Sequence, residues 1–312
     1  MAPTVETLPF ERLKSLLSAS RVNYDACLDH IDHTDFCTGI AATTRLHHLR
    51  RNPNGQLKLE SLAQCLAKHA IDFAISARRR PESMTAQEAM ELAQEARHLF
   101  RVVAANAADT AGDAGELLLY FLLEAVVGAP QVVAKYELKT NPAVEVHGSD
   151  GIHMRVHPDD GIVDIYFGEA KCYQSVSTAI GRAFTSIEAF HEKGLLEHEY
   201  ALVTSHFKGV DDLLKAAVIR LLDTGAPGPD CRINHACLIA YDWSATGLSP
   251  EMAADQIDAE YRKQLLADSG RLHQLLQAQV DACKVKQFRF EVFFLPFDSV
   301  QAFRDAFERA MR

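Results

Sequence analysis

Two extended segments joined by a short turn, within residues 148–173, constrain the fold of this chain more than any other stretch. Side chains alternate between the two faces of a strand, so Glu169 and Lys171 both lie at the end of the apolar face of the second strand. A turn near 158–161 brings Asp150, which opens the first strand, opposite Glu169 or its neighbour in an antiparallel register. The pattern therefore predicts two carboxylates and one ammonium group that meet at one edge of a sheet.

These three side chains indicate hydrolysis of a phosphodiester. Two nearby carboxylates, Asp150 and Glu169, suit a hard divalent cation such as Mg²⁺, or Mn²⁺ in its place. A lysine beside them, Lys171, can orient a metal-bound water or neutralise charge that develops on a phosphate. The alternative is a structural salt bridge at a solvated strand end, which the same residue types also form.

A third carboxylate, Glu116, stands at the start of an apolar helix expected over 116–127. Its spacing from Asp113 resembles a capping box, in which Glu116 would serve only the start of the helix. Glu116 also begins a polar stripe with Tyr120 and Glu124, and a stripe that faces the sheet edge would bring Glu116 to the metal. Both interpretations are open at this stage.

Four further polar residues flank the predicted site. His153 lies on the opposite face of its strand from Asp150, and it either contacts DNA or belongs to a polar core. Lys139, Gln174 and Arg182 are candidates for contacts with phosphates of a substrate. Polar residues at strand ends and on helices are more often simply solvated, which is the alternative for these three.

The charge balance argues against a protein that holds nucleic acid by bulk electrostatics. The chain of 312 residues carries 32 lysines and arginines against 42 acids, a formal net charge of −10. A nucleic-acid enzyme with this balance needs a local basic groove, a bound metal or a partner that delivers the substrate. No apolar run is long enough to span a membrane and no signal peptide is recognisable, so the cytoplasm is the expected location.

Residues 1–110 are predicted to form a mostly helical N-terminal region of uncertain role. Apolar spacing indicates a helix within 59–78, and a capping box at Thr85 starts a second helix that runs to about residue 107. A linker of small residues follows and marks the start of a second domain, residues 111–312.

Two motifs in this region leave alternatives open. The segment 25–37, rich in histidine and acids, matches no standard zinc spacing, which favours a polar loop or a half-exposed strand over a metal site. The basic cluster at 45–56 is either a solvated face or a patch that contacts phosphates. The seven cysteines include no CxxC pair, so they indicate neither a zinc ribbon nor a disulfide framework.

The second domain alternates helical and extended patterns, and its first part has the order α-β-β-β-α-β. The expected strands are 131–138, 143–147, 150–157, 162–171, 200–205, 234–242 and 287–297. The expected helices are 116–127, 176–192, 210–223, a helical stretch to about 283 with a break near 268–270, and 299–311. The predicted fold class is therefore α/β, or α+β, with a central mixed sheet flanked by helices.

Residues 115–180 resemble the core of the HamA family, the nuclease subunits of the Hachiman anti-phage defence system. The resemblance is carried by the combination of GELLLYFLLEAVV, HGSDGIH and FGEAKCY, and it is densest over 115–205. HamA belongs to the PD-(D/E)xK phosphodiesterase superfamily, so the resemblance implies a restriction-endonuclease-like core. The first hundred residues are only weakly similar.

The resemblance also implies a role for each site residue. Asp150 and Glu169 would be metal ligands, and Lys171 would be the catalytic lysine. Glu116 would be the acid that the superfamily carries on its first helix. The chain departs from the superfamily pattern at Ser149, where many members have a proline before the first acid.

The function implied by the resemblance is a Mg²⁺-dependent deoxyribonuclease. It would be the effector subunit of a complex with a superfamily 2 helicase, HamB, encoded beside it. One alternative is a catalytically silent nuclease fold that binds DNA or docks the helicase. Another is a ribonuclease on the same scaffold.

Overall fold

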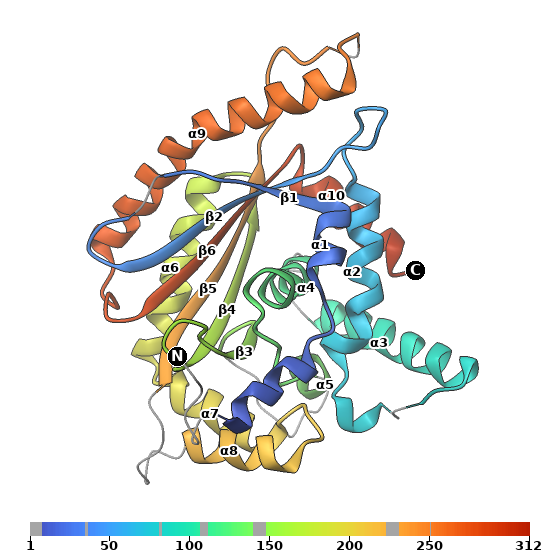
Figure 1. The fold of residues 1–312 in the computed structure, drawn as a ribbon, viewed down its shortest axis with the longest axis vertical. Coiled ribbons are helices and arrows are strands. Elements are labelled where there is room, and N and C mark those ends of the chain that lie inside the picture. The colour runs from blue at the N-terminus through green and yellow to red at the C-terminus, as the bar shows by residue number, and fades with distance from the viewer. Residues whose placement is uncertain are drawn as a thin grey trace.

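The computed structural model describes residues 8–34, 37–80, 83–106, 112–139, 148–222, 231–249 and 251–312. In this part of the chain six strands form one sheet with helices on both faces (Figure 1). The strands are β1 (Leu28–Ile31), β2 (Ala41–Leu49), β3 (Gly151–Val156), β4 (Val163–Tyr173), β5 (Cys231–Asp242) and β6 (Arg289–Phe297).

The sheet is mixed, with the strand order β1-β2-β6-β5-β4-β3. The four central strands are parallel, whereas β1 and β3 join the two edges in antiparallel fashion. Central parallel strands are buried on both faces. In β5, for example, Cys237 and Ile239 pack into one helical layer, and Ala236 and Leu238 pack into the other. The predicted mixed sheet flanked by helices is confirmed.

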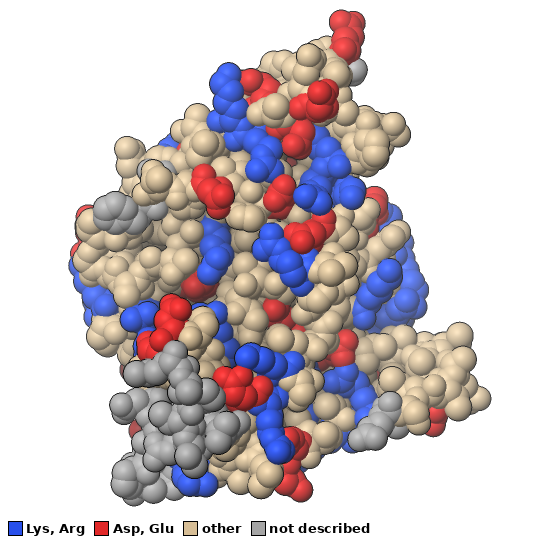
Figure 2. Space-filling model, viewed as in Figure 1, with Lys and Arg blue, Asp and Glu red and all other residues tan. Residues whose placement is uncertain are grey.

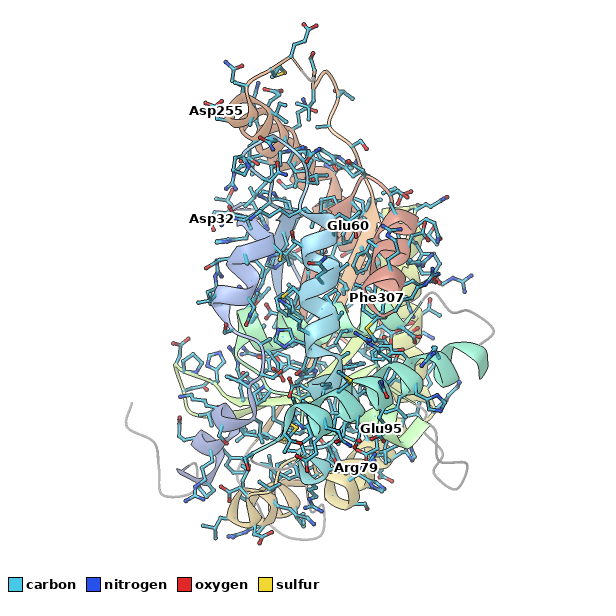
Figure 3. All side chains as sticks on the ribbon, turned by 90° about the vertical axis from the view of Figure 1, so that its right-hand side faces the viewer. Asp32, Glu60, Arg79, Glu95, Asp255 and Phe307 are labelled. Atoms are coloured by element: carbon cyan, nitrogen blue, oxygen red, sulfur yellow. The ribbon has the colours of Figure 1, made fainter. Side chains whose placement is uncertain are left out.

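The larger helical layer packs over one face of the sheet, with α1, α2 and α4 to the right of the central strands in Figure 1. Its members are α1 (Arg21–Cys27), α2 (Leu59–Ala74), α3 (Ala86–Asn106), α4 (Asp113–Leu122) with its continuation η3 (Leu123–Val127), α5 (Lys135–Lys139) and α10 (Val300–Ala310). Figure 3 shows α10 beside α2, with Phe307 of α10 near that contact. The same figure shows Arg79 and Glu95, which form an ion pair at 2.7 Å between η2 (Ala77–Arg79) and α3.

The opposite face is covered by α6 (Val176–Glu192) and α9 (Ala254–Ala282). A third apolar cluster joins β3 and β4 to η1 (Leu8–Leu16), α7 (Leu195–His206) and α8 (Asp212–Leu222). In the described chain, every helix is too short or too polar to cross a membrane.

Most of the predicted elements are confirmed. The hairpin of β3 and β4, the helix α6, the strands β5 and β6 and the closing helix α10 all form where the pattern places them. The capping box ahead of α3 also forms, since the amide of Thr85 donates to Glu88 at 2.8 Å and the amide of Glu88 donates to the Thr85 hydroxyl at 3.3 Å.

Two predicted strands are helices instead. Segment 131–138 makes a single β-bridge, between Gln131 and His153, and then turns into α5, where Lys135 points inward to Glu199. Segment 200–205 belongs to α7, whose buried residues recur at helical spacing (Glu199, Leu202 and Val203). Both segments are short and apolar, and such runs do not distinguish strand from helix by periodicity. The strand expected at 143–147 lies outside the described residues.

The expected break near 268–270 is absent, because α9 runs unbroken through these positions. Gly270 sits in open space, and a single glycine costs a helix only about 1 kcal/mol relative to alanine. The hydroxyl of Ser269 donates to the Leu266 carbonyl at 2.8 Å, so it is satisfied within the helix.

The N-terminal region contributes two strands to the same sheet. The half-exposed strand considered for 25–37 corresponds to β1, whereas β2 is not predicted from the sequence. The basic cluster at 45–56 is not only a solvated face, because His47 and His48 of β2 are each 1% exposed. The division into domains at residue 110 stays a prediction.

Candidate active site

The adjoining ends of β3 and β4 place Asp150 as the sequence predicts. Gly151 pairs with Gly168, and the amide of Asp150 donates to the Gly168 carbonyl at 2.8 Å. The Oδ2 atom of Asp150 then accepts from the amide of Ala170 at 2.7 Å. β3 does not extend past this point, whereas β4 runs on to Tyr173. The Asp150 carboxylate therefore accepts the hydrogen bond from Ala170 that the backbone of a neighbouring strand would otherwise accept.

Glu169 and Lys171 project from the same face of β4 and form an ion pair. Glu169 is 8% exposed, and its carboxylate also accepts a hydrogen bond from Ser186 of α6. The structure thus brings together the two carboxylates and the ammonium group that the hairpin pattern predicts.

The electrostatics of this cluster are set by burial and by Asp150. Burial first, and then the charge of Asp150, raise the pKa of Glu169 to about 7 against the opposing effect of Lys171. Burial acts to lower the pKa of Lys171, but Glu169 and Asp150 outweigh it and the pKa is raised. Burial is thus the main cause of the raised pKa of Glu169, and Glu169 is the main cause of the raised pKa of Lys171; the negative charge of Asp150 adds to both shifts. Lys171 is therefore an ammonium ion at neutral pH.

Helix α4 brings Glu116 toward the same strand end. Gly115 packs so closely on β4 that a Cβ there would lie 2.7 Å from the sulfur of Cys172. Burial raises the pKa of Tyr136, and the charges of Glu116 and Asp150 raise it further. The half-buried Glu116 and Asp150 therefore both lie near the hydroxyl of Tyr136.

The capping-box interpretation of Glu116 is wrong. The N-cap of α4 is Gly112 and not Asp113, and the Asp113 carboxylate instead accepts a hydrogen bond from the hydroxyl of Tyr136. The polar stripe does continue to Glu124, but that side chain is 2% exposed and accepts from backbone amides near the start of the chain. Of the stripe, Glu116 is the member that lies by the end of β4.

A buried ion pair holds the backbone that leads into Asp150. The charged atoms of Lys135 and Glu199 lie 2.6 Å apart, and the two side chains are 1% and 0% exposed. Both bind Ser149: the ammonium group donates to its carbonyl at 2.7 Å, and the carboxylate accepts from its amide at 2.7 Å. Gly148 has a φ of 112° and no room for a Cβ against Glu199. Sequence reasoning missed this pair, since no local pattern links residues 64 positions apart.

Of the four flanking candidates, His153 and Arg182 lie apart from Asp150, Glu169 and Lys171, and the side chain of Lys139 lies outside the described residues. His153 is 1% exposed, its Nδ1 lies 2.8 Å from a backbone carbonyl, and burial lowers its pKa to about 3. A contact between His153 and DNA is therefore contradicted, and the polar-core alternative is confirmed. Lys139 ends α5, and its side chain lies outside the description. Arg182 is exposed on α6, one turn from both Thr178 and Ser186.

An open cleft of about 520 Å³ lies beside the end of β4, bordered by the starts of α4, α6 and α10. The side chains that line it include Lys171, Gln174, Ser175, Thr178, Gln301 and Arg304. Within the described chain, aspartate and glutamate are absent from this lining. The sequence pointed to Gln174 but not to Arg304, whose Nη2 donates to the Cys172 carbonyl at 2.7 Å. The position of Arg304 on an amphipathic helix does not predict its contact with a backbone carbonyl of a distant strand.

The donor set fits Mg²⁺ or Mn²⁺ held by two carboxylates. Among the described residues no group of three or more histidine, cysteine, aspartate or glutamate side chains is arranged to hold a metal ion. Mg²⁺ usually keeps several waters and takes one or two carboxylates together with substrate phosphates. Asp150 and Glu169 can supply two carboxylates, and the repulsion between them is one that a divalent cation would remove.

Comparison with known proteins identifies a family. The family model described as HamA matches residues 25–311, nearly the whole chain. A search of curated proteins finds no match.

Proposed function

The chain belongs to the HamA family of the Hachiman anti-phage defence system, and from this premise we propose that it is a metal-dependent DNA nuclease. It hydrolyses phosphodiester bonds as the effector subunit of a helicase–nuclease complex. The observation that carries the proposal is the convergence of Asp150, Glu169 and Lys171 at the end of β4. A solvated salt bridge would need only one acid, and it would not place the acid 8% exposed beside a second carboxylate.

In this mechanism Asp150 and Glu169 would hold Mg²⁺, or Mn²⁺, and Glu116 would support them from α4. When bound, the metal would supply Lewis-acid stabilisation of the phosphate and of the attacking water. Lys171 remains protonated, so it orients the water and neutralises charge on the phosphate and does not act as a general base. Ser186 and the amide of Ala170 fix the two carboxylates by hydrogen bonds.

The partner in this proposal is a superfamily 2 helicase, HamB. On the face of the molecule that Figure 2 shows, basic and acidic side chains are intermingled. Together with the net charge of −10, this favours delivery of DNA by a partner over capture by a broad basic surface. The helicase would supply most of the affinity for DNA, and the nuclease would need only local contacts.

Cleavage of plasmid DNA tests the proposal. The full chain is assayed alone and with the helicase encoded beside it, in the presence of Mg²⁺ and ATP. Wild type should cut the plasmid, and Glu169→Ala and Lys171→Ala should each lower the rate by roughly 100-fold or more. Glu192→Ala and Lys284→Ala are matched controls, because these residues form an exposed ion pair at the far end of α6, and they should cut at the wild-type rate.

The outcomes separate the alternatives. Equal cleavage by wild type and both site variants would rule out the assignment. A wild-type complex that binds DNA equally well in EDTA and never cuts it would favour the silent binding module. Cleavage of RNA but not of DNA would favour the ribonuclease.

A further inference from the structure

The cleft beside the end of β4 runs along a strand edge that has no neighbouring strand among the described residues. β3 pairs with one side of β4 only as far as Gly168, whereas β5 pairs with the other side as far as Tyr173. Beyond Gly168 the free edge of β4 is used by side chains, since the Cys172 carbonyl accepts from Arg304. Lys171 lines this cleft, so the cleft adjoins the acid–acid–lysine cluster.

The cleft is locally positive although the chain is acidic. Lys171 and Arg304 line it, and no described carboxylate does. Lys171 is engaged by Glu169, whereas Arg304 forms no ion pair with any residue that the structure describes. The Nε atom of Arg304 is buried without a hydrogen-bond partner in that part of the chain. In a chain with a net charge of −10, Arg304 is thus a cation that no described carboxylate neutralises, and it favours an anion in this cleft.

The start of α6 reinforces this preference, because its first turn carries no acid. Ser175, the N-cap of α6, and Thr178 of its first turn line the cleft. Amides at a helix start and the positive end of the helix dipole both favour an anion. The volume of about 520 Å³ falls within the range of pockets that bind small ligands, so it can take a nucleotide unit.

We propose that this cleft binds a phosphodiester of the nucleic-acid strand next to the one that is cut, and that Arg304 contacts its phosphate. The inference rests on the proposed function, because it takes the substrate at Asp150 and Glu169 to be a polynucleotide. A planar guanidinium offers parallel N–H donors to phosphate oxygens, a geometry that an ammonium group lacks. The hydrogen bond from Arg304 to the Cys172 carbonyl fixes α10 to β4, the strand that carries Glu169 and Lys171. β4 therefore positions both the residues proposed to bind the phosphate that is cut and the arginine proposed to bind the next phosphate.

The experiment measures DNA binding by the full chain. A fluorescein-labelled oligonucleotide is titrated in Ca²⁺, which replaces Mg²⁺ so that cleavage does not interfere, and anisotropy gives the Kd. Arg304→Ala should raise the Kd by roughly tenfold or more. Gln301→Glu, which adds a carboxylate to the cleft and leaves Arg304 in place, should also raise the Kd. Arg309→Ala, on the same helix with its side chain paired to Glu60, and Gln274→Glu on α9 should stay within twofold of wild type.

Each outcome decides one of the two proposals. Wild-type affinity in folded Arg304→Ala and in Gln301→Glu would overturn the inference, and if Arg304→Ala fails to fold, Gln301→Glu decides alone. Glu169→Ala should bind the oligonucleotide but not cut it in Mg²⁺. If wild type binds DNA through Arg304 and yet never cuts it, the proposed function fails while the phosphate site stands.

Discussion

Two lysine–glutamate pairs flank Asp150, and they have opposite characters. Lys135 and Glu199 are 1% and 0% exposed, and both are tied to the backbone of the residue before Asp150. The side chains of Lys171 and Glu169 are 21% and 11% exposed, and they lie beside the charge of Asp150. The same two residue types therefore make a structural clamp in one place and part of the proposed metal site in the other.

The difference arises from the third charge. In the clamp, Lys135 pairs with Glu199, and the hydroxyl of Ser149 hydrogen-bonds to both side chains. In the cluster, one cation faces two anions, so a negative charge is left over in a partly buried place. A leftover charge of this kind costs folding free energy unless a cation joins it. The comparison thus separates a pair that stabilises the fold from a pair that the fold does not need and that the proposed chemistry uses.

The largest expected effect comes from removing one partner of the clamp. Glu199→Ala removes the carboxylate that Lys135 binds in a buried place and should lower the free energy of unfolding by about 3–5 kcal/mol. Glu169→Gln removes the uncompensated charge and should leave this free energy unchanged or raise it. Urea denaturation followed by circular dichroism measures both, with the exposed Glu192→Ala as control. Equal losses in Glu199→Ala and Glu169→Gln would contradict the distinction between the two pairs.

A smaller effect is expected from pH. The pKa of Glu169 is about 7 in the folded chain and ordinarily 4.5, so the folded state holds an extra proton between these values. The wild type should therefore lose stability as pH rises from about 4.5 to 7, by on the order of 1–3 kcal/mol, and Glu169→Gln should lack this loss. The measurement is the unfolding free energy of both proteins across that range without divalent metal. If the unfolding free energies of the two proteins changed with pH in parallel, the pKa of Glu169 would not be raised in the folded state.

The placement of Glu169 and Lys171 could be predicted from the sequence, because their geometry is local. A strand period of two puts Glu169 and Lys171 on one face, and a four-residue turn sets the register that brings Asp150 opposite them. The mixed sheet and most of the helices follow from the same kind of short-range periodicity. The family resemblance then adds roles to residues that the pattern had already brought together.

The clamp and the cleft could not be predicted, because they depend on contacts between distant segments. Segment 131–138 has the apolar character of a strand, and the contacts of Lys135 with Glu199 and Ser149, both distant in sequence, account for its burial within a helix. Arg304 reaches a carbonyl 132 positions away, a contact that no spacing on α10 encodes. The environment of His153 could not be predicted for the same reason. Strand alternation predicts the face on which His153 lies, but not its contact with the Ala129 carbonyl.

The central claim is that Asp150 and Glu169 together bind one divalent cation, and titration with Mn²⁺ tests it most directly. Isothermal calorimetry on the full chain needs neither DNA nor helicase, so it does not depend on activation of the enzyme. Wild type and Glu192→Gln should each bind one Mn²⁺, whereas Asp150→Asn and Glu169→Gln should lose this binding event. Unchanged Mn²⁺ binding in folded Asp150→Asn and Glu169→Gln would contradict the account.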